Sequence, residues 1–113
     1  MEDLKDILCS ASFYKQGYFL NDKFDRLPEG IKKDLKIISV TLAQRIRAIS
    51  IIGFYKDNGD VYIEVMNQAD DLLYDEIAAK LELGYVERDN EELFSSLSLW
   101  YKTFMIGDKD ENR

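Results

Sequence analysis

Residues 48–67 read Ala-Ile-Ser-Ile-Ile-Gly-Phe-Tyr-Lys-Asp-Asn-Gly-Asp-Val-Tyr-Ile-Glu-Val-Met-Asn, and this stretch decides the fold. Asn58-Gly59 lies between two runs of strand-forming residues. This dipeptide is a strong hairpin signal, because the favoured two-residue turn needs positive φ at both positions. Alternate positions of the second run are aliphatic, as on one face of a strand: Val61, Ile63 and Val65. The sequence therefore predicts a β-hairpin with strands at 48–55 and 60–67.

The segment before the hairpin supports two interpretations. Pro28 suits the first turn of a helix, where its missing N–H is no loss. Three aliphatic residues then recur at helical spacing: Ile31, Leu35 and Ile38. From residue 36 onward, however, β-branched residues are frequent and the side chains also alternate as in a strand. We predict a strand over 36–43, and a helix spanning 28–47 is the alternative.

The first 21 residues give a weaker pattern. Residues 7–21 are rich in Phe, Tyr and Ser and alternate loosely. Lys15-Gln16-Gly17 is suited to a turn. The segment is therefore either two short strands joined by that turn or a single strand after an irregular stretch.

A first helix is predicted after the hairpin, over 70–83. Asn67 or Asp70 is suited to cap it, and Gly84 is suited to end it. Its core-facing residues are expected to be Leu73, Ile77 and Leu81, with Leu72, Ala79 and Leu83 beside them. The acidic residues of 70–76 are typical of a helix N-terminus, and we do not assign them to a metal site.

A second helix is predicted over 90–106, after a short strand over 85–88. Asp89 is expected at its cap and Gly107 at its end. The fold class is therefore α+β, in a single domain over 1–107. An antiparallel sheet, about 36–66, is expected to pack against the two C-terminal helices, about 70–83 and 90–106. Residues 108–113 are expected to form a disordered polar tail.

The composition argues against several kinds of chemistry. The 113 residues include no His and one Cys, so we expect no His-based catalysis, no cysteine zinc cluster and no internal disulfide. The glycines are scattered and form no phosphate-binding loop. Cys9 is interpreted as a small buried side chain. We name no catalytic residue, metal ligand or cofactor, and we favour a protein that is not an enzyme.

The charges and the hydrophobic runs argue against two kinds of partner. The net charge of -7 disfavours general nucleic-acid binding, which needs a basic field. A local anion or RNA contact by the basic segment 21–50, through Lys32, Lys33 and Lys36, is a less favoured option. A membrane helix needs roughly 20 apolar residues, and no charge-free run approaches that length. With an acidic N-terminus and no disulfide, we expect a cytoplasmic protein.

The last predicted helix carries more apolar residues than a small core needs. Excess apolar helix surface is typical of a contact with another protein. We therefore predict a protein-interaction domain that acts as a homodimer. The interface candidates on this helix are Leu97, Trp100, Tyr101 and Phe104.

The competing hypothesis is a small-molecule-binding protein with a pocket between sheet and helices. The candidates for the polar lining of that pocket are Tyr62, Glu64 and Tyr74.

Five stretches of the chain are similar to a known but uncharacterised family. They are 14–21 (Tyr-Lys-Gln-Gly-Tyr-Phe-Leu-Asn), 24–31 (Phe-Asp-Arg-Leu-Pro-Glu-Gly-Ile), 35–37 (Leu-Lys-Ile), 73–77 (Leu-Tyr-Asp-Glu-Ile) and the ending 97–104. They resemble a family of short proteins of clostridia and related Firmicutes, a domain of unknown function. The resemblance implies a bacterial cytoplasmic protein and carries over no catalytic residue. In size and acidity the chain also resembles the small α+β chaperones of bacterial secretion systems, which are dimers; this is a fold-level analogy.

Overall fold

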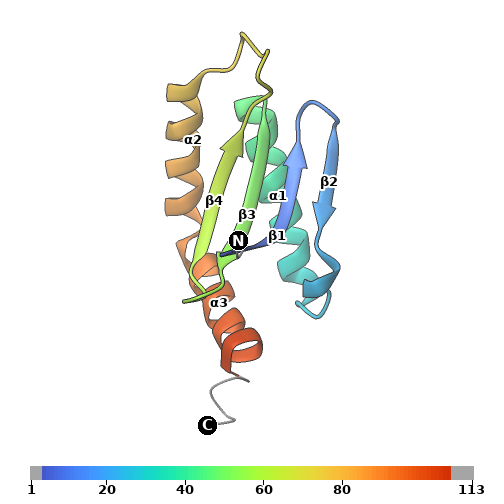
Figure 1. Ribbon diagram of the computed structural model, residues 1–113, viewed down its shortest axis with the longest axis vertical. Coiled ribbons are helices and arrows are strands. Elements are labelled where there is room, and N and C mark those ends of the chain that lie inside the picture. The colour runs from blue at the N-terminus through green and yellow to red at the C-terminus, as the bar shows by residue number, and fades with distance from the viewer. Residues whose placement is uncertain (1–3, 108–113) are drawn as a thin grey trace.

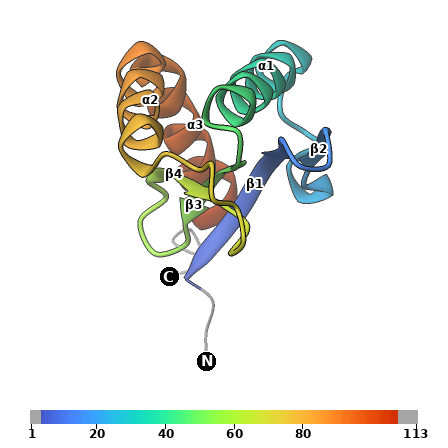
Figure 2. The same ribbon diagram turned by 90° about the horizontal axis from the view of Figure 1, so that it is seen from above.

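An antiparallel sheet forms one layer of the molecule and the helices form the other (Figures 1 and 2). The computed structural model describes residues 4–107. Within them the strands are β1 (Lys5–Ser12), β2 (Gly17–Leu20), β3 (Ile49–Tyr55) and β4 (Val61–Met66), in the sheet order β2-β1-β3-β4. The helices are α1 (Glu29–Ile46), α2 (Glu76–Asp89) and α3 (Glu91–Tyr101), with a 3₁₀ turn η1 (Asp22–Phe24) and a π-helical turn η2 (Lys102–Ile106). The predicted α+β domain with an antiparallel sheet is confirmed.

The predicted hairpin is confirmed as β3 and β4, but its turn is not the expected one. Gly59 has a positive φ of 79°, whereas Asn58 does not. The Gly59 N–H donates to the Tyr55 carbonyl oxygen at 2.7 Å, and the Asn58 side chain accepts from the Asp60 N–H at 2.8 Å. The loop is therefore longer than two residues, and Asn58 stabilises it through its side-chain oxygen.

The predicted strand over 36–43 is wrong, and the alternative helix is correct. Helix α1 follows Pro28, which lies at its N-cap, and ends at Arg47, whose φ is 55°. Its buried residues recur at the helical period: Leu35, Ser39, Leu42, Ala43 and Ile46. Burial of this face outweighs the strand preference of the β-branched residues, which is a weak local term.

The sheet is wider than 36–66, because the N-terminal segment supplies two of its strands. Of the two alternatives for residues 7–21, the pair of strands is correct, and Gln16 turns the chain with a φ of 52°. Strand β1 pairs with both β2 and β3, so it lies inside the sheet. A register shift between Ile7 and Cys9 inserts Leu8, which is fully buried.

Helix α2 begins six residues later than predicted and continues through Gly84. Neither Asn67 nor Asp70 caps it; the Asp75 side chain accepts from the Ala78 N–H at 3.0 Å. Asp71 holds the preceding loop, because it accepts from the Tyr14 hydroxyl at 2.6 Å. The short strand expected over 85–88 is wrong, since these residues belong to α2.

Helix α3 begins where predicted, with Asn90 rather than Asp89 at its N-cap. Turn η2 continues it to Ile106, and Gly107 lies at the C-cap as predicted. The tail expected at 108–113 lies outside the described residues. No helix within residues 4–107 has the length and apolarity needed to cross a bilayer.

Aromatic rings form the part of the core where α3 meets the sheet. Phe54 and Tyr101 stack with ring centroids 4.4 Å apart, and Phe24 lies 5.4 Å from Phe54. These three residues come from β3, η1 and the end of α3, so their packing joins distant parts of the chain.

Gly53 of β3 lies against the backbone of Asp6 in β1 and the side chain of Tyr62 in β4. A Cβ atom there would be 2.6 Å from the Asp6 carbonyl oxygen and 2.6 Å from the Tyr62 hydroxyl. We expect Gly53→Ala to lower the free energy of unfolding by about 1–3 kcal/mol, because the backbone of β1 must shift. Urea unfolding checks this, with Gly30→Ala as the matched control, since a Cβ at Gly30 meets nothing within 4 Å. Equal effects of the two substitutions would contradict the prediction.

Candidate interaction surfaces

Two contacts define which face of the sheet the helices cover. The Ser50 hydroxyl donates to the Ser39 carbonyl oxygen of α1 at 2.9 Å, and Phe54 stacks on Tyr101. Side chains of a strand alternate between faces, so Ile51 and Tyr55 point away from the helices. In Figure 2 all three helices lie on one side of the strands, and none lies on the other.

The uncovered face, called the outer sheet face below, is largely apolar. The strand register places these residues on it: Ile7, Phe19, Ile49, Ile51, Tyr55, Tyr62 and Met66. Phe19 and Met66 are 54% and 53% exposed. A sheet face in contact with water is normally polar at alternate positions, so this face departs from the expected pattern.

The two charged residues of the outer sheet face neutralise each other. The Lys5 ammonium forms an ion pair with Glu64 and lies 5.0 Å from the centre of the Tyr62 ring. The outer sheet face therefore has no net charge from this pair. An exposed, largely apolar sheet face without net charge is typical of a site for another protein.

The structure does not bring the three predicted pocket residues together. Tyr62 and Glu64 are on the outer sheet face, away from the helices, and the Tyr62 ring covers Gly53. Tyr74 is in the loop between β4 and α2, where its side chain is partly buried against the core. A shared pocket of these residues stays a prediction that this placement does not support.

The four predicted interface residues are divided between core and surface. Leu97 and Tyr101 are 2% and 4% exposed, because they pack inside the chain. Trp100 is partly buried against Phe24, and Phe104 is 48% exposed beside Trp100. Only Phe104 of the four therefore presents a substantially exposed side chain, and the role of the set as an interface stays a prediction.

A second exposed apolar surface, in addition to the outer sheet face, lies on helix α2. The sequence pattern predicted that its residues would face the core. Ile77, Leu81 and Tyr85 are 75%, 55% and 44% exposed. The opposite side of the helix packs on the core through Ala79, Leu83 and Val86. The predicted core-facing set is therefore correct for Ala79 and Leu83 and wrong for the others: Ile77 and Leu81 face outward, and Leu72 and Leu73 precede the helix and are exposed.

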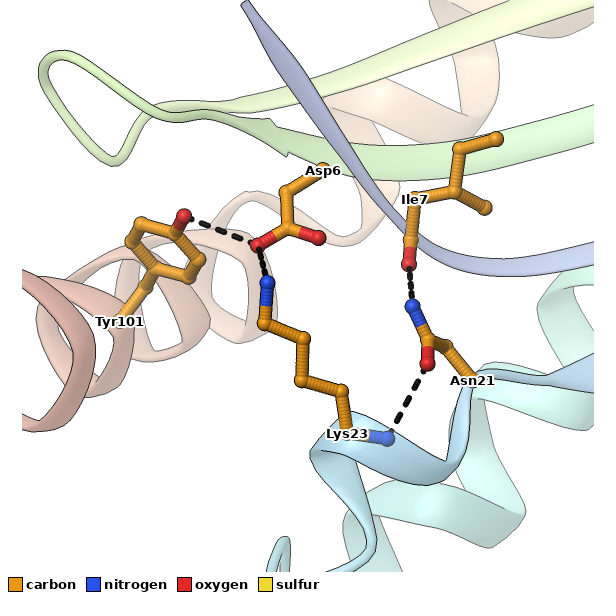
Figure 3. Close-up of polar contacts among 5 residues, drawn as sticks. All are labelled: Asp6, Ile7, Asn21, Lys23 and Tyr101. Carbon is orange, nitrogen blue, oxygen red and sulfur yellow. Dashed lines mark hydrogen bonds and ion pairs between the residues drawn. The ribbon is translucent and has the colours of Figure 1, made fainter. Parts of the chain in front are cut away.

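A buried carboxylate holds three distant segments together (Figure 3). Asp6 is 6% exposed, and its Oδ2 atom accepts from the Lys23 ammonium at 2.8 Å and from the Tyr101 hydroxyl at 3.0 Å. Burial, and then the hydrogen bond to Asp6, raise the pKa of Tyr101 to about 12. Asn21 adds a link by donating to the Ile7 carbonyl oxygen at 2.8 Å. Sequence patterning missed this cluster, because its members are up to 95 positions apart.

Three further buried polar residues, Cys9, Ser39 and Ser50, contact one another. Cys9 is fully buried, as predicted, with its sulfur 3.3 Å from the Ser39 hydroxyl oxygen. Burial raises the pKa of the Cys9 thiol, so the neutral form is favoured. Among residues 4–107, no group of three or more Cys, Asp or Glu side chains is arranged to hold a metal ion.

The chain belongs to a family described as "Family of unknown function (DUF6145)", whose model matches residues 5–109. This confirms the expectation of an uncharacterised family; its restriction to clostridia and related Firmicutes stays a prediction. No curated protein and no solved structure matches the chain.

The Tyr101–Asp6 hydrogen bond predicts a change of stability at alkaline pH. Because the pKa of Tyr101 is raised from 10.0 to about 12, its stabilisation is complete below pH 10 and is lost as the pH rises through 12. We expect Tyr101→Phe to lower the free energy of unfolding by about 1–2 kcal/mol at pH 8. The difference from the wild type should shrink at pH 11, as urea unfolding at both pH values will measure. An equal difference in the free energy of unfolding at pH 8 and pH 11 would contradict the prediction.

Proposed function

We propose that this member of the family is a non-enzymatic protein-interaction domain that acts as a homodimer and binds another protein on its outer sheet face. The observation that carries the proposal is the apolar character of that face. Its side chains come from all four strands, and no helix among residues 4–107 lies over them. Burying a side chain such as Phe19 or Ile51 fully in a complex contributes about 1.5–3 kcal/mol relative to its exposed state.

The polar clusters support a structural rather than a catalytic role. Asp6 binds Lys23 and Tyr101, and in doing so joins β1, η1 and the end of α3. Tyr14 and Asp71 likewise join the first turn of the sheet to the loop before α2. We therefore assign these groups a structural role: they position the outer sheet face and the outward apolar surface of α2.

The same proposal includes a cellular location and a kind of partner. We place the protein in the bacterial cytoplasm, where an acidic dimer with open apolar faces is suited to hold a client protein, as secretion chaperones do. The support is the net charge of -7, the single cysteine and the outer sheet face.

Photo-crosslinking tests the proposed partner site. Benzoylphenylalanine replaces Phe19 or Met66, two exposed residues of the outer sheet face, in cells that naturally produce the protein. We expect discrete adducts heavier than two chains at both positions, with the same second protein identified by mass spectrometry. An apolar surface in contact with a partner is the physical reason.

The matched control replaces Leu99, which is 65% exposed on α3 and lies on the helical side of the molecule. No adduct with that second protein is expected there. Absence of adducts at Phe19 and Met66, or the same adducts at all three positions, would show that the outer sheet face is not the partner site.

A cleft between the first hairpin and α1 favours small-molecule binding as a second candidate function. The cleft has a volume of about 390 Å³, and its polar lining consists of Ser12, Gln16, Tyr18, Lys36 and Gln44. The Lys36 ammonium lies 5.9 Å from the centre of the Tyr18 ring, so the cleft has one positive charge near its aromatic wall.

A thermal-shift screen with metabolites and divalent cations tests this second function. A ligand at 100 times its dissociation constant stabilises the folded state by about 2.7 kcal/mol. We expect such an effect for an anionic compound, with loss of the shift in Lys36→Gln and retention in Lys33→Gln, whose lysine is exposed and does not line the cleft. No shift from any compound, or equal shifts in both variants, would contradict binding in this cleft.

A further inference from the structure

Taking the proposed homodimer as the premise, we infer that the outward surface of α2 binds the same surface of a second copy. The two α2 helices run antiparallel across a two-fold axis that passes close to Gly84. The contact surface of each copy consists of Ile77, Lys80, Leu81, Gly84, Tyr85 and Glu87.

The first support is that α2 is apolar on two opposite sides. One side, with Leu83 and Val86, packs on the core of its own chain. The other side exposes Ile77, Leu81 and Tyr85, which follow one another at intervals of four residues. A surface helix of a monomer has one apolar side, and a helix that is apolar on both is normally covered on both.

The second support is Gly84, which lies in the interior of α2. Glycine disfavours a helix relative to alanine, so its presence there calls for a reason. Residues 4–107 provide none: a Cβ at Gly84 would meet none of their atoms within 4 Å, and its φ is not positive. A missing side chain does have a use between two helices, because it lets their backbones approach closely.

The third support is the arrangement of charge around Gly84. Lys80 and Glu87 are seven residues apart, which is two helical turns, so they share one flank of α2. Neither takes part in an ion pair within the described part of the chain. In an antiparallel pair centred near Gly84, Lys80 lies level with Glu87 of the partner subunit.

The opposite flank is complementary in the same geometry. Leu81 of one copy then lies beside Tyr85 of the partner subunit. The Arg88 guanidinium lies 5.2 Å from the centre of the Tyr85 ring in its own chain and extends the contact. Each surface thus matches itself after a two-fold rotation, which is the requirement for a contact between identical subunits.

The position of α2 leaves room for the second copy. Figures 1 and 2 both show α2 at the margin of the molecule, with α1 on the other side of the helix layer.

The experiment measures dimer dissociation of the full chain by sedimentation velocity over a range of concentrations. Wild-type protein should be a dimer of twice 13.2 kDa. Gly84→Ala should weaken the dimer by about tenfold, because a methyl group separates the helices. At concentrations where both proteins are monomeric, the same substitution should raise the thermal midpoint, because alanine favours the helix. A weaker dimer together with a more stable monomer is the result expected only if Gly84 lies at a contact between two helices.

Charge exchange provides a second, independent measurement. Lys80→Glu and Glu87→Lys should each weaken the dimer, since each creates two like-charge contacts across the axis. The double variant should restore it, because both ion pairs return with reversed polarity. Gly30→Ala, at a second glycine with open space around it, is the control and should leave dissociation unchanged.

The outcomes separate this inference from the proposed homodimer. A wild-type protein that stays monomeric at every concentration overturns both. A dimer that tolerates Gly84→Ala and shows no rescue by the double variant overturns the α2 contact alone, and places the homodimer on another surface. Weakening by Gly84→Ala together with rescue by the double variant supports the antiparallel α2 contact.

Discussion

All three helices pack on the same face of the sheet, and the rest of the molecule depends on this constraint. Helix α1 connects β2 to β3 and crosses β1 on that face, while α2 and α3 follow β4 and return over the same side (Figure 2). The centre of the inner face is thereby covered, with Leu8, Ile52 and Phe54 inaccessible to solvent. The outer sheet face has no equivalent layer among residues 4–107, although most of its larger side chains are apolar or aromatic. The chain therefore builds its core from one side of a sheet that is suited to burial on both.

Long-range polar contacts hold the one-sided arrangement in place. Asp6 on β1 binds Lys23 from η1 and Tyr101 from the end of α3, so one carboxylate aligns the N-terminal strand with the C-terminal helix (Figure 3). A buried carboxylate is favourable only when it is paired and hydrogen-bonded, and both conditions are met here. At the other end of the sheet, Tyr14 binds Asp71 and fixes the loop that leads into α2. The direction in which α2 presents its outward surface follows from that loop and from the Asp75 cap.

The local parts of the fold were predictable from sequence, and the parts that depend on distant contacts were not. The β3–β4 hairpin depends on Asn58, Gly59 and the alternation beside them, which are neighbours in the chain. The β-branched residues of 36–43 favour a strand over the correct helix α1, and the helical period there is weakened by Ser39, a buried polar residue whose partners are Cys9 and Ser50. A pattern that treats serine as solvent-exposed loses the helical period at that position. In α2, both sides are apolar, so periodicity identified the stripe at Ile77 and Leu81 but not the direction it faces.

The same reasoning explains which surface residues could be found. The last helix was expected to bind a partner because it carries more apolar residues than a small core needs, yet Tyr101 is covered by Phe54 and Asp6 of its own chain. The outer sheet face could not be identified from the sequence, because its residues, such as Phe19, Ile51 and Met66, come from different strands.

In the proposed dimer, contact through α2 leaves both outer sheet faces uncovered, since α2 lies in the helix layer. A dimer of this kind presents two identical apolar faces, so a client with two suitable segments gains affinity from the second contact without any new type of interaction. Dimerisation through helices and client binding through sheets are thus compatible, because they use different layers of one small domain.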